Sequence, residues 1–148
     1  GLYEKALAIR ERVLGEEHPD TATGCNNLAH VYASQGEYGK AEGLYEKALA
    51  IRERVLGEEY PSTATGYNNL AGVYASQGEY GKAQELYEKA LAIRERVLGE
   101  EHPDTAASYN NLAYVYADQG NNEEALSYYL KAYRICMLRL GKNIPIHK

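Results

Sequence analysis

The sequence predicts an all-α fold, a solenoid of antiparallel helix pairs, and three observations support this prediction. First, one unit is copied along the chain, because the segment LYEKALAIRERVLGEE begins at Leu2 and again at Leu44 and Leu86, a fixed step of 42 residues. Second, apolar and small residues recur at helical spacing inside each unit. Third, no stretch alternates apolar and polar residues over a useful length, so no strand is expected. A repeat period of about 20 to 50 residues is typical of stacked repeat proteins.

Each unit is predicted to form two helices. The first helix begins at a proline, whose missing N–H has no helical partner at that position anyway, and it ends at a glycine. These residues are Pro19, Pro61 and Pro103 at the starts and Gly36, Gly78 and Gly120 at the ends. The second helix is expected from about Glu37 to Leu56 in the first unit, with Ala41, Leu44, Tyr45, Ala48, Leu49 and Val55 on its buried side. The chain then divides into a leading second helix at 1–15, repeats at 19–57, 61–99 and 103–141, and a tail at 142–148.

Composition and charge narrow the function. The 148 residues suffice for one folded domain of ordinary hydrophobic content, and the formal net charge of −5 argues against a nucleic-acid binder, which usually carries a basic stripe. No run of about 18 apolar residues exists, so no membrane span or membrane partner is expected. Nothing at the start resembles a signal peptide. Cys25 and Cys136 form no disulfide framework, which favours reduced thiols and a cytoplasmic location.

The reactive side chains suggest neither catalysis nor a metal site. His18 and His102 occupy equivalent loops two repeats apart, while Cys25 and His30 diverge on one helix. No glycine-rich phosphate loop is present. The carboxylates of EKALAIRERVLGEE recur in every unit, whereas a catalytic pair would be made once, so we expect them to form a solvated outer face with local charge pairs. The sequence therefore predicts a protein that is not an enzyme and needs no cofactor or metal.

The repeated positions resemble a tetratricopeptide repeat. That family has an aromatic residue, Leu, a small residue, Tyr and Gly on the first helix, then Ala, an aromatic residue and Ala on the second. The second unit carries this pattern as Tyr67, Leu70, Ala71, Tyr74, Gly78, Ala83, Tyr87 and Ala90, and the other units depart from it only at Cys25. The 42-residue unit, with LAIRERVLGEEHPDTA and NNLA, is similar to the repeats of kinesin light chains and to arrays attached to NB-ARC receptor-like ATPases. The resemblance implies a right-handed superhelix whose first helices line a concave groove.

Paired asparagines recur on each first helix, and the first of each pair is a candidate ligand contact. When Leu70 and Tyr74 are placed in the interior, Asn68 falls on the neighbouring open face. A side-chain amide offers a donor and an acceptor together, so a row of amides could hold a peptide backbone of any sequence. We expect the second asparagines, Asn27, Asn69 and Asn111, to bond to an adjoining helix or turn. An open alternative is that both asparagines only tie repeats together. The full set of expected groove residues is Asn26, Asn68, Asn110, His30, Gly72, Tyr114, Thr65 and Ser76.

The position one turn beyond the first asparagine differs in every copy, as His30, Gly72 and Tyr114. Glycine inside a helix costs roughly 0.5–1 kcal/mol against alanine. One interpretation is a bare pocket at Gly72 that gives selectivity along the groove. The other is drift on a tolerant surface.

The two ends and the overall role complete the prediction. The chain begins inside a second helix, which suggests a fragment of a longer array. The last helix replaces the mixed IRERVL pattern with apolar residues, so we expect it to pack on its own tail (Ile144, Pro145, Ile146), on a neighbouring domain or on another molecule, including head-to-tail stacking of chains.

The predicted function is non-catalytic recognition of a peptide or protein segment, as a cargo adaptor or as the sensing arm of an NB-ARC-type receptor. The alternative is a structural spacer or self-associating scaffold with no peptide ligand.

Overall fold

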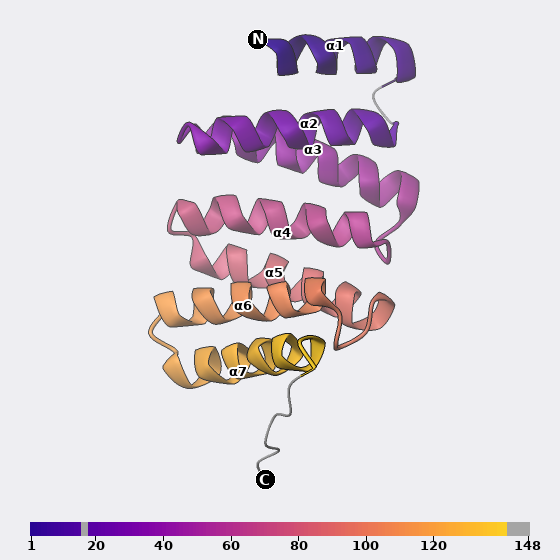
Figure 1. The fold of residues 1–148 in the computed structure, drawn as a ribbon. Helices are drawn as coiled ribbons and strands as arrows, with labels where there is room; N and C mark the ends of the chain where they lie inside the picture. Colours follow the sequence, from indigo (N-terminus) through magenta and orange to yellow (C-terminus); the bar gives the residue numbers. More distant parts are fainter. Residues whose placement is uncertain (16–17, 142–148) are drawn as a thin grey trace.

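The computed structural model describes residues 1–15 and 18–141 of the chain. These residues form seven α-helices and no strand. The helices are α1 (Leu2–Leu14), α2 (Pro19–Ser34), α3 (Tyr38–Leu56), α4 (Pro61–Ser76), α5 (Tyr80–Val97), α6 (Pro103–Asp118) and α7 (Asn122–Arg139). Figure 1 shows them stacked one after another from α1 to α7, so the chain advances steadily in one direction. The prediction of an all-α solenoid is confirmed, while the expected tail at 142–148 lies outside the described residues.

Helix pairing follows the chain order. The pairs α2–α3, α4–α5 and α6–α7 make the most extensive contacts, and each second helix also packs against the first helix that follows it. A glycine with positive φ ends each first helix, as at Gly78 with φ of 80°. That left-handed backbone suits glycine, which has no Cβ to clash.

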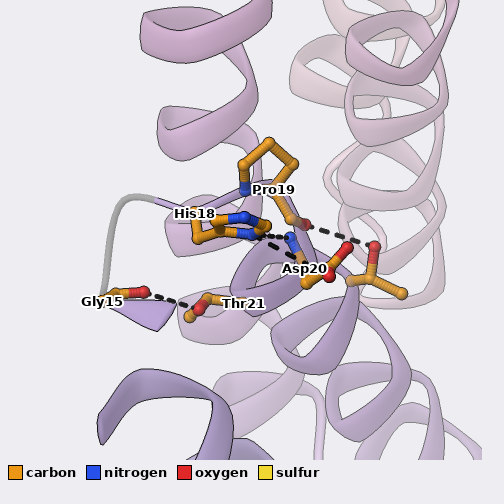
Figure 2. Close-up of polar contacts among 6 residues, drawn as sticks. Gly15, His18, Pro19, Asp20 and Thr21 are labelled. Carbon is orange, nitrogen blue, oxygen red and sulfur yellow. Dashed lines mark hydrogen bonds and ion pairs between the residues drawn. The ribbon is translucent and has the colours of Figure 1, made fainter. Parts of the chain in front are cut away.

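Histidine caps two of the three first helices (Figure 2). In the first repeat the Nδ1 atom of His18 accepts a hydrogen bond from the backbone N–H of Asp20 at 3.0 Å. His102 and Asp104 repeat this bond at the same distance. Tyr60 stands at the equivalent place in the second repeat, where no side-chain cap bond forms. A capping side chain satisfies one of the backbone donors that a helix start leaves unpaired.

A buried threonine closes each loop between repeats. The Thr21 hydroxyl donates to the carbonyl oxygen of Gly15 at 2.7 Å (Figure 2). Thr63 and Thr105 make the same bond, to Gly57 and Gly99, at 2.8 Å. All three threonines are fully buried, so the hydroxyl has to find a partner inside the protein, and the loop carbonyl supplies it.

Alanines allow close packing inside each pair. Ala29, Ala41 and Ala48 are fully buried, so the backbones of α2 and α3 approach with only methyl groups between them. The prediction that Val55 lies on the buried side of α3 is wrong, because Val55 is 46% exposed. Ile51 is buried in its place, since it lies one turn beyond Ala48, whereas Val55 lies near the end of the helix.

Candidate functional site

The asparagine pairs form a ladder that links the first helices. The Nδ2 atom of Asn69 on α4 donates to Oδ1 of Asn26 on α2 at 3.1 Å. The Nδ2 atom of Asn111 on α6 donates to Oδ1 of Asn68 on α4 at 2.9 Å. The second asparagine of one repeat thus bonds to the first asparagine of the repeat before it. The prediction that the second asparagine bonds to an adjoining helix holds for Asn69 and Asn111.

The ladder uses only part of each amide. An asparagine side chain carries two N–H donors and one oxygen with two lone pairs. Among the described residues, no hydrogen bond reaches Nδ2 of Asn26 or Asn68 or Oδ1 of Asn69 or Asn111. Each bonded asparagine pair, called a rung here, therefore ties two repeats together. The first asparagine of the rung still offers an N–H donor, and the second still offers an acceptor oxygen. The bonds show that the asparagines tie repeats together, while the prediction of ligand contact and the alternative that they only tie repeats together both stay open.

Two hollows lie beside the rungs of this ladder. The first, of about 300 Å³, lies between α2 and α4 and is lined by Tyr3, Asn26, Asn27, His30, Val31, Tyr45 and Asn69. The second, of about 290 Å³, is lined by Ala33, Tyr38, Tyr45, Asn68, Asn69, Gly72, Val73, Ser76 and Tyr87. Tyr45 and Asn69 border both hollows, so the two form adjacent parts of one surface along the first helices.

The predicted groove residues divide into two groups. Five of them line a hollow, namely Asn26, His30, Asn68, Gly72 and Ser76. The other three lie outside both hollows, namely Thr65, Asn110 and Tyr114, and all three are exposed. Thr65 donates its hydroxyl to the Pro61 carbonyl oxygen of its own helix at 3.3 Å. Asn110 on α6 is equivalent to Asn26 on α2. Helix α6 is the first helix of the last repeat that the structure describes.

Both hollows are electrically neutral. No Asp, Glu, Lys or Arg lines either of them, so hydrogen-bonding groups dominate their chemistry. Burial raises the pKa of Tyr45 and Tyr87 above the ordinary value for tyrosine. Their hydroxyls therefore keep their protons at neutral pH and are able to donate hydrogen bonds. A Cβ atom placed on Gly72 would lie 3.6 Å from the Tyr87 hydroxyl oxygen, so the glycine leaves this hydroxyl uncovered.

Sequence reasoning missed the aromatic walls of the hollows. The sequence predicts only a packing role for Tyr45 and Tyr87, and it predicts no role for Tyr38. A detectable signal existed, because a tyrosine buried at a helix pair needs a partner or water for its hydroxyl, which places that hydroxyl near a surface.

The expectation of a solvated outer face is wrong for part of the EKALAIRERVLGEE segment. Arg52 and Arg94 are buried, and burial lowers the pKa of both guanidinium groups. The Tyr67 hydroxyl donates to Oε2 of Glu53, and the Tyr109 hydroxyl donates to Oε2 of Glu95 at 2.6 Å. These residues face the following repeat, so the recurring charges serve contacts between repeats rather than solvation alone.

The described residues show neither a metal-binding cluster nor a membrane-spanning helix. No group of three or more His, Cys, Asp or Glu residues in this part of the chain could hold a metal ion. Separately, none of the helices in the part of the chain described here is long and apolar enough to cross a membrane.

Stacked helix pairs, a 42-residue period and an asparagine ladder define a helical-repeat protein. A family model described as tetratricopeptide repeat matches residues 1–54, 25–95 and 62–137. The chain therefore belongs to the tetratricopeptide repeat family, as the sequence resemblance implied.

Solved structures agree on the subtype. The chain is 34% identical to BtubC (BKLC) from P. vanneervenii, with a TM-score of 0.87 over 99% of this chain and 58% of that one. It is 31% identical to a Podosopora anserina protein described as a kinesin light chain with nearly identical TPR-like repeats, with a TM-score of 0.81 over 95% of this chain and 66% of that one. The chain thus spans 58% and 66% of the lengths of these relatives. The predicted resemblance to kinesin light chains is confirmed.

A more distant structure shares the fold alone. The N-terminal domain of stress-induced protein-1 from C. elegans is 20% identical, with a TM-score of 0.63 over 79% of this chain and 85% of that one. No curated protein sequence matches the chain. The expected similarity to NB-ARC receptor arrays stays a prediction.

Proposed function

We propose that this array binds an extended peptide or protein segment along the surface of its first helices, without catalysis. Members of the family generally serve as protein–protein interaction modules, and this proposal gives that role a site. Asn26 and Asn68 would donate to carbonyl oxygens of the segment, and Asn69 and Asn111 would accept from its N–H groups. Asn110 would extend this row of asparagines on α6, the first helix of the third repeat.

The observation that carries the proposal is the half-used amide ladder. A pair of asparagines that served only to join repeats would have no need of open hollows at each rung, yet both rungs border one. Each added hydrogen bond contributes about 0.5–1.5 kcal/mol net, so binding needs several rungs at once. Since the backbone pattern is the same in any peptide, the ladder would give affinity and not sequence preference.

Sequence preference would come from the position that differs between repeats. Gly72 leaves the second hollow open above the Tyr87 hydroxyl, whereas His30 borders the first. Tyr114 is 60% exposed and could stack on an aromatic or flat side chain. Because both hollows lack charged side chains, we expect affinity for uncharged polar residues and little dependence on ionic strength.

A peptide-display selection tests the proposal. The array would be compared with Gly72→Tyr, which fills the second hollow and breaks no bond between repeats. The matched control is Gly81→Tyr on α5, where an added Cβ would meet nothing within 4 Å. We expect enriched peptides that Gly81→Tyr still binds and Gly72→Tyr loses. An Asn26/Asn68/Asn110 triple alanine variant of verified helicity should lose them too.

Two results would overturn the proposal. One is a selection that enriches nothing, which would favour the alternative of a spacer or scaffold. The other is a set of peptides that bind Gly72→Tyr as well as the parent, which would place the contact on another surface. Enriched sequences would also separate a cargo adaptor from a sensing arm, by naming the kind of segment bound. The proposal includes a cytoplasmic location.

A further inference from the structure

Two buried tyrosine hydroxyls at the second hollow have no partner within the described part of the chain. Tyr45 on α3 and Tyr87 on α5 are only 4% and 8% exposed, and both line this hollow. No polar side-chain atom of the described residues is both sealed from solvent and unpaired, so these two hydroxyl oxygens must reach the open space of the hollow. Since buried polar groups are almost always hydrogen-bonded, their partner has to enter through the hollow, as water or as a ligand group.

A third tyrosine shows how this fold treats a hydroxyl that has a structural role. Tyr67 is buried to the same degree, at 3% exposed, and donates its hydroxyl to Oε2 of Glu53. Burial alone raises the pKa of Tyr45 and Tyr87, whereas at Tyr67 the contact with Glu53 adds to the effect of burial. The fold thus supplies a carboxylate where a tyrosine hydroxyl joins repeats, and it supplies none at the second hollow.

Gly72 makes the Tyr87 hydroxyl accessible. A Cβ atom at this position would lie 3.6 Å from the hydroxyl oxygen, so any side chain here would begin in contact with it. The equivalent position at the first hollow carries His30, which lines that hollow together with Tyr45. The second hollow is therefore the one in which a tyrosine hydroxyl faces a bare backbone, with room for a side chain that comes from outside.

The unused hydrogen-bonding groups of the second hollow complement a carboxamide. Asn68 offers N–H donors, Asn69 offers an acceptor oxygen, and the Tyr87 hydroxyl can donate or accept. A carboxamide carries two N–H donors and one carbonyl oxygen, so it can pair with both kinds of group at once. A charged side chain would lose its water here without meeting an opposite charge, and an apolar one would leave the polar groups of the hollow unpaired.

We propose that the second hollow binds an asparagine or glutamine side chain of the bound segment. The Tyr87 hydroxyl donates to the carboxamide oxygen, and Oδ1 of Asn69 accepts from the carboxamide nitrogen. This inference rests on the proposed function, because the amide ladder has to hold the segment across the hollow. It adds the residue type that the array selects and makes Tyr87 the residue that determines this preference.

A random peptide library selected on the parent array supplies the probe. We expect the enriched peptides to share asparagine or glutamine at one position. A glutamine peptide is then synthesised again with methionine or glutamate there, and an asparagine peptide with leucine or aspartate. Calorimetric titration should show binding about 3- to 10-fold weaker for the apolar replacement, as expected for one lost hydrogen bond. The acidic replacement should weaken binding further, because it places an unpaired charge in the hollow.

Tyr87→Phe tests the hydroxyl itself. The variant should bind the carboxamide peptide and its apolar replacement equally, which completes a double-mutant cycle between protein and ligand. Its midpoint of thermal unfolding should match that of the parent, since no described residue bonds to the hydroxyl. Tyr67→Phe is the matched control with the opposite pattern. It loses the bond to Glu53, so its unfolding midpoint should fall while the preference for the carboxamide peptide stays.

The outcomes separate this inference from the proposed function. A selection that enriches nothing would overturn both. Peptides that share no carboxamide residue, but that the Asn26/Asn68/Asn110 triple alanine variant no longer binds, would overturn this inference and leave the proposed function standing. A preference for the carboxamide peptide that survives Tyr87→Phe would also overturn it.

Discussion

At the scale of single residues, the buried arginines show how near-identical copies can differ in stability. The guanidinium of Arg94 donates to Oγ of Ser108 at 2.8 Å and to the Asp104 carbonyl oxygen at 3.4 Å. Among the residues that the structure describes, Arg52 has only the second kind of bond, to the Ser62 carbonyl oxygen at 3.4 Å. The reason is that Gly66 stands where the third repeat has Ser108. A buried charge with fewer hydrogen bonds is costlier to keep.

Gly66→Ser should supply the missing hydroxyl. We expect it to be more stable than Gly66→Ala by about 1.5–3 kcal/mol, as a hydrogen bond to a charged group contributes. Alanine is the right comparison because either side chain brings Cβ to 3.0 Å from Cδ1 of Leu49, which must shift slightly in both variants. Urea unfolding of the two variants gives the difference directly. Equal stabilities would show that Arg52 does not use the hydroxyl.

The uncapped helix α4 offers a second residue-scale prediction. Tyr60→His should provide the Nδ1 acceptor that His18 and His102 provide, and should raise the free energy of unfolding by about 0.5–1 kcal/mol. Tyr60→Phe is the control, since it keeps the ring without an acceptor and should change little. Thermal unfolding of both variants measures the effect, and an unchanged Tyr60→His variant would contradict the capping argument.

At the scale of helices, tyrosine–carboxylate bonds join a second helix to the next first helix. Burial, and after it the hydrogen bond to Glu95, raises the pKa of Tyr109. Burial and the hydrogen bond to Glu53 raise the pKa of Tyr67 in the same way. Burial and Glu88 raise the pKa of Tyr116 to about 12. A group whose folded pKa exceeds its unfolded value stabilises the fold below the unfolded pKa and loses that contribution as the pH rises.

Stability should therefore fall as the pH rises from about 10, the ordinary tyrosine pKa, towards the raised folded values. Tyr109→Phe removes one of the titrating groups, so its stability should fall less steeply over the same range. At neutral pH the free energy of unfolding of Tyr109→Phe should also be lower than that of the parent by about 0.5–1.5 kcal/mol, because the hydrogen bond is lost. Urea unfolding from neutral to alkaline pH measures both effects, and parallel pH curves for the two proteins would contradict this account.

The helices also show what a sequence can and cannot predict. Every first helix begins at the predicted proline, because that residue acts locally through its missing N–H. The ladder partners were not predicted, since the bond from Asn69 to Asn26 joins residues 43 apart in the chain. The burial of Arg52 was missed for the same reason: the same letters in IRERVL describe a solvated or a buried arginine, and only the next repeat decides which. The expected groove residues stay predictions, five at the hollows and three outside them.

At the scale of the whole molecule, the described helices pack chiefly against the helices next to them in the chain. Helix α4 packs against both α3 and α5, whereas α1 packs against α2 and buries only Leu7 of its own residues. In a linear array of this kind, local opening is easiest where one neighbour is absent. Amide hydrogen exchange should therefore be slowest in α4 and fastest in α1. Mass-spectrometric exchange on peptides from each helix measures this order, and uniform protection along the chain would show a single cooperative unit instead.

The amide ladder also bears on how the number of repeats in such a protein can change in evolution. Each rung is made by one repeat and completed by the next, and every repeat carries both halves. A gene that gained or lost one copy by unequal recombination would still encode a chain in which every internal rung closes. The length of the amide ladder can thus change in whole steps of 42 residues, with no other mutation needed to accommodate the change.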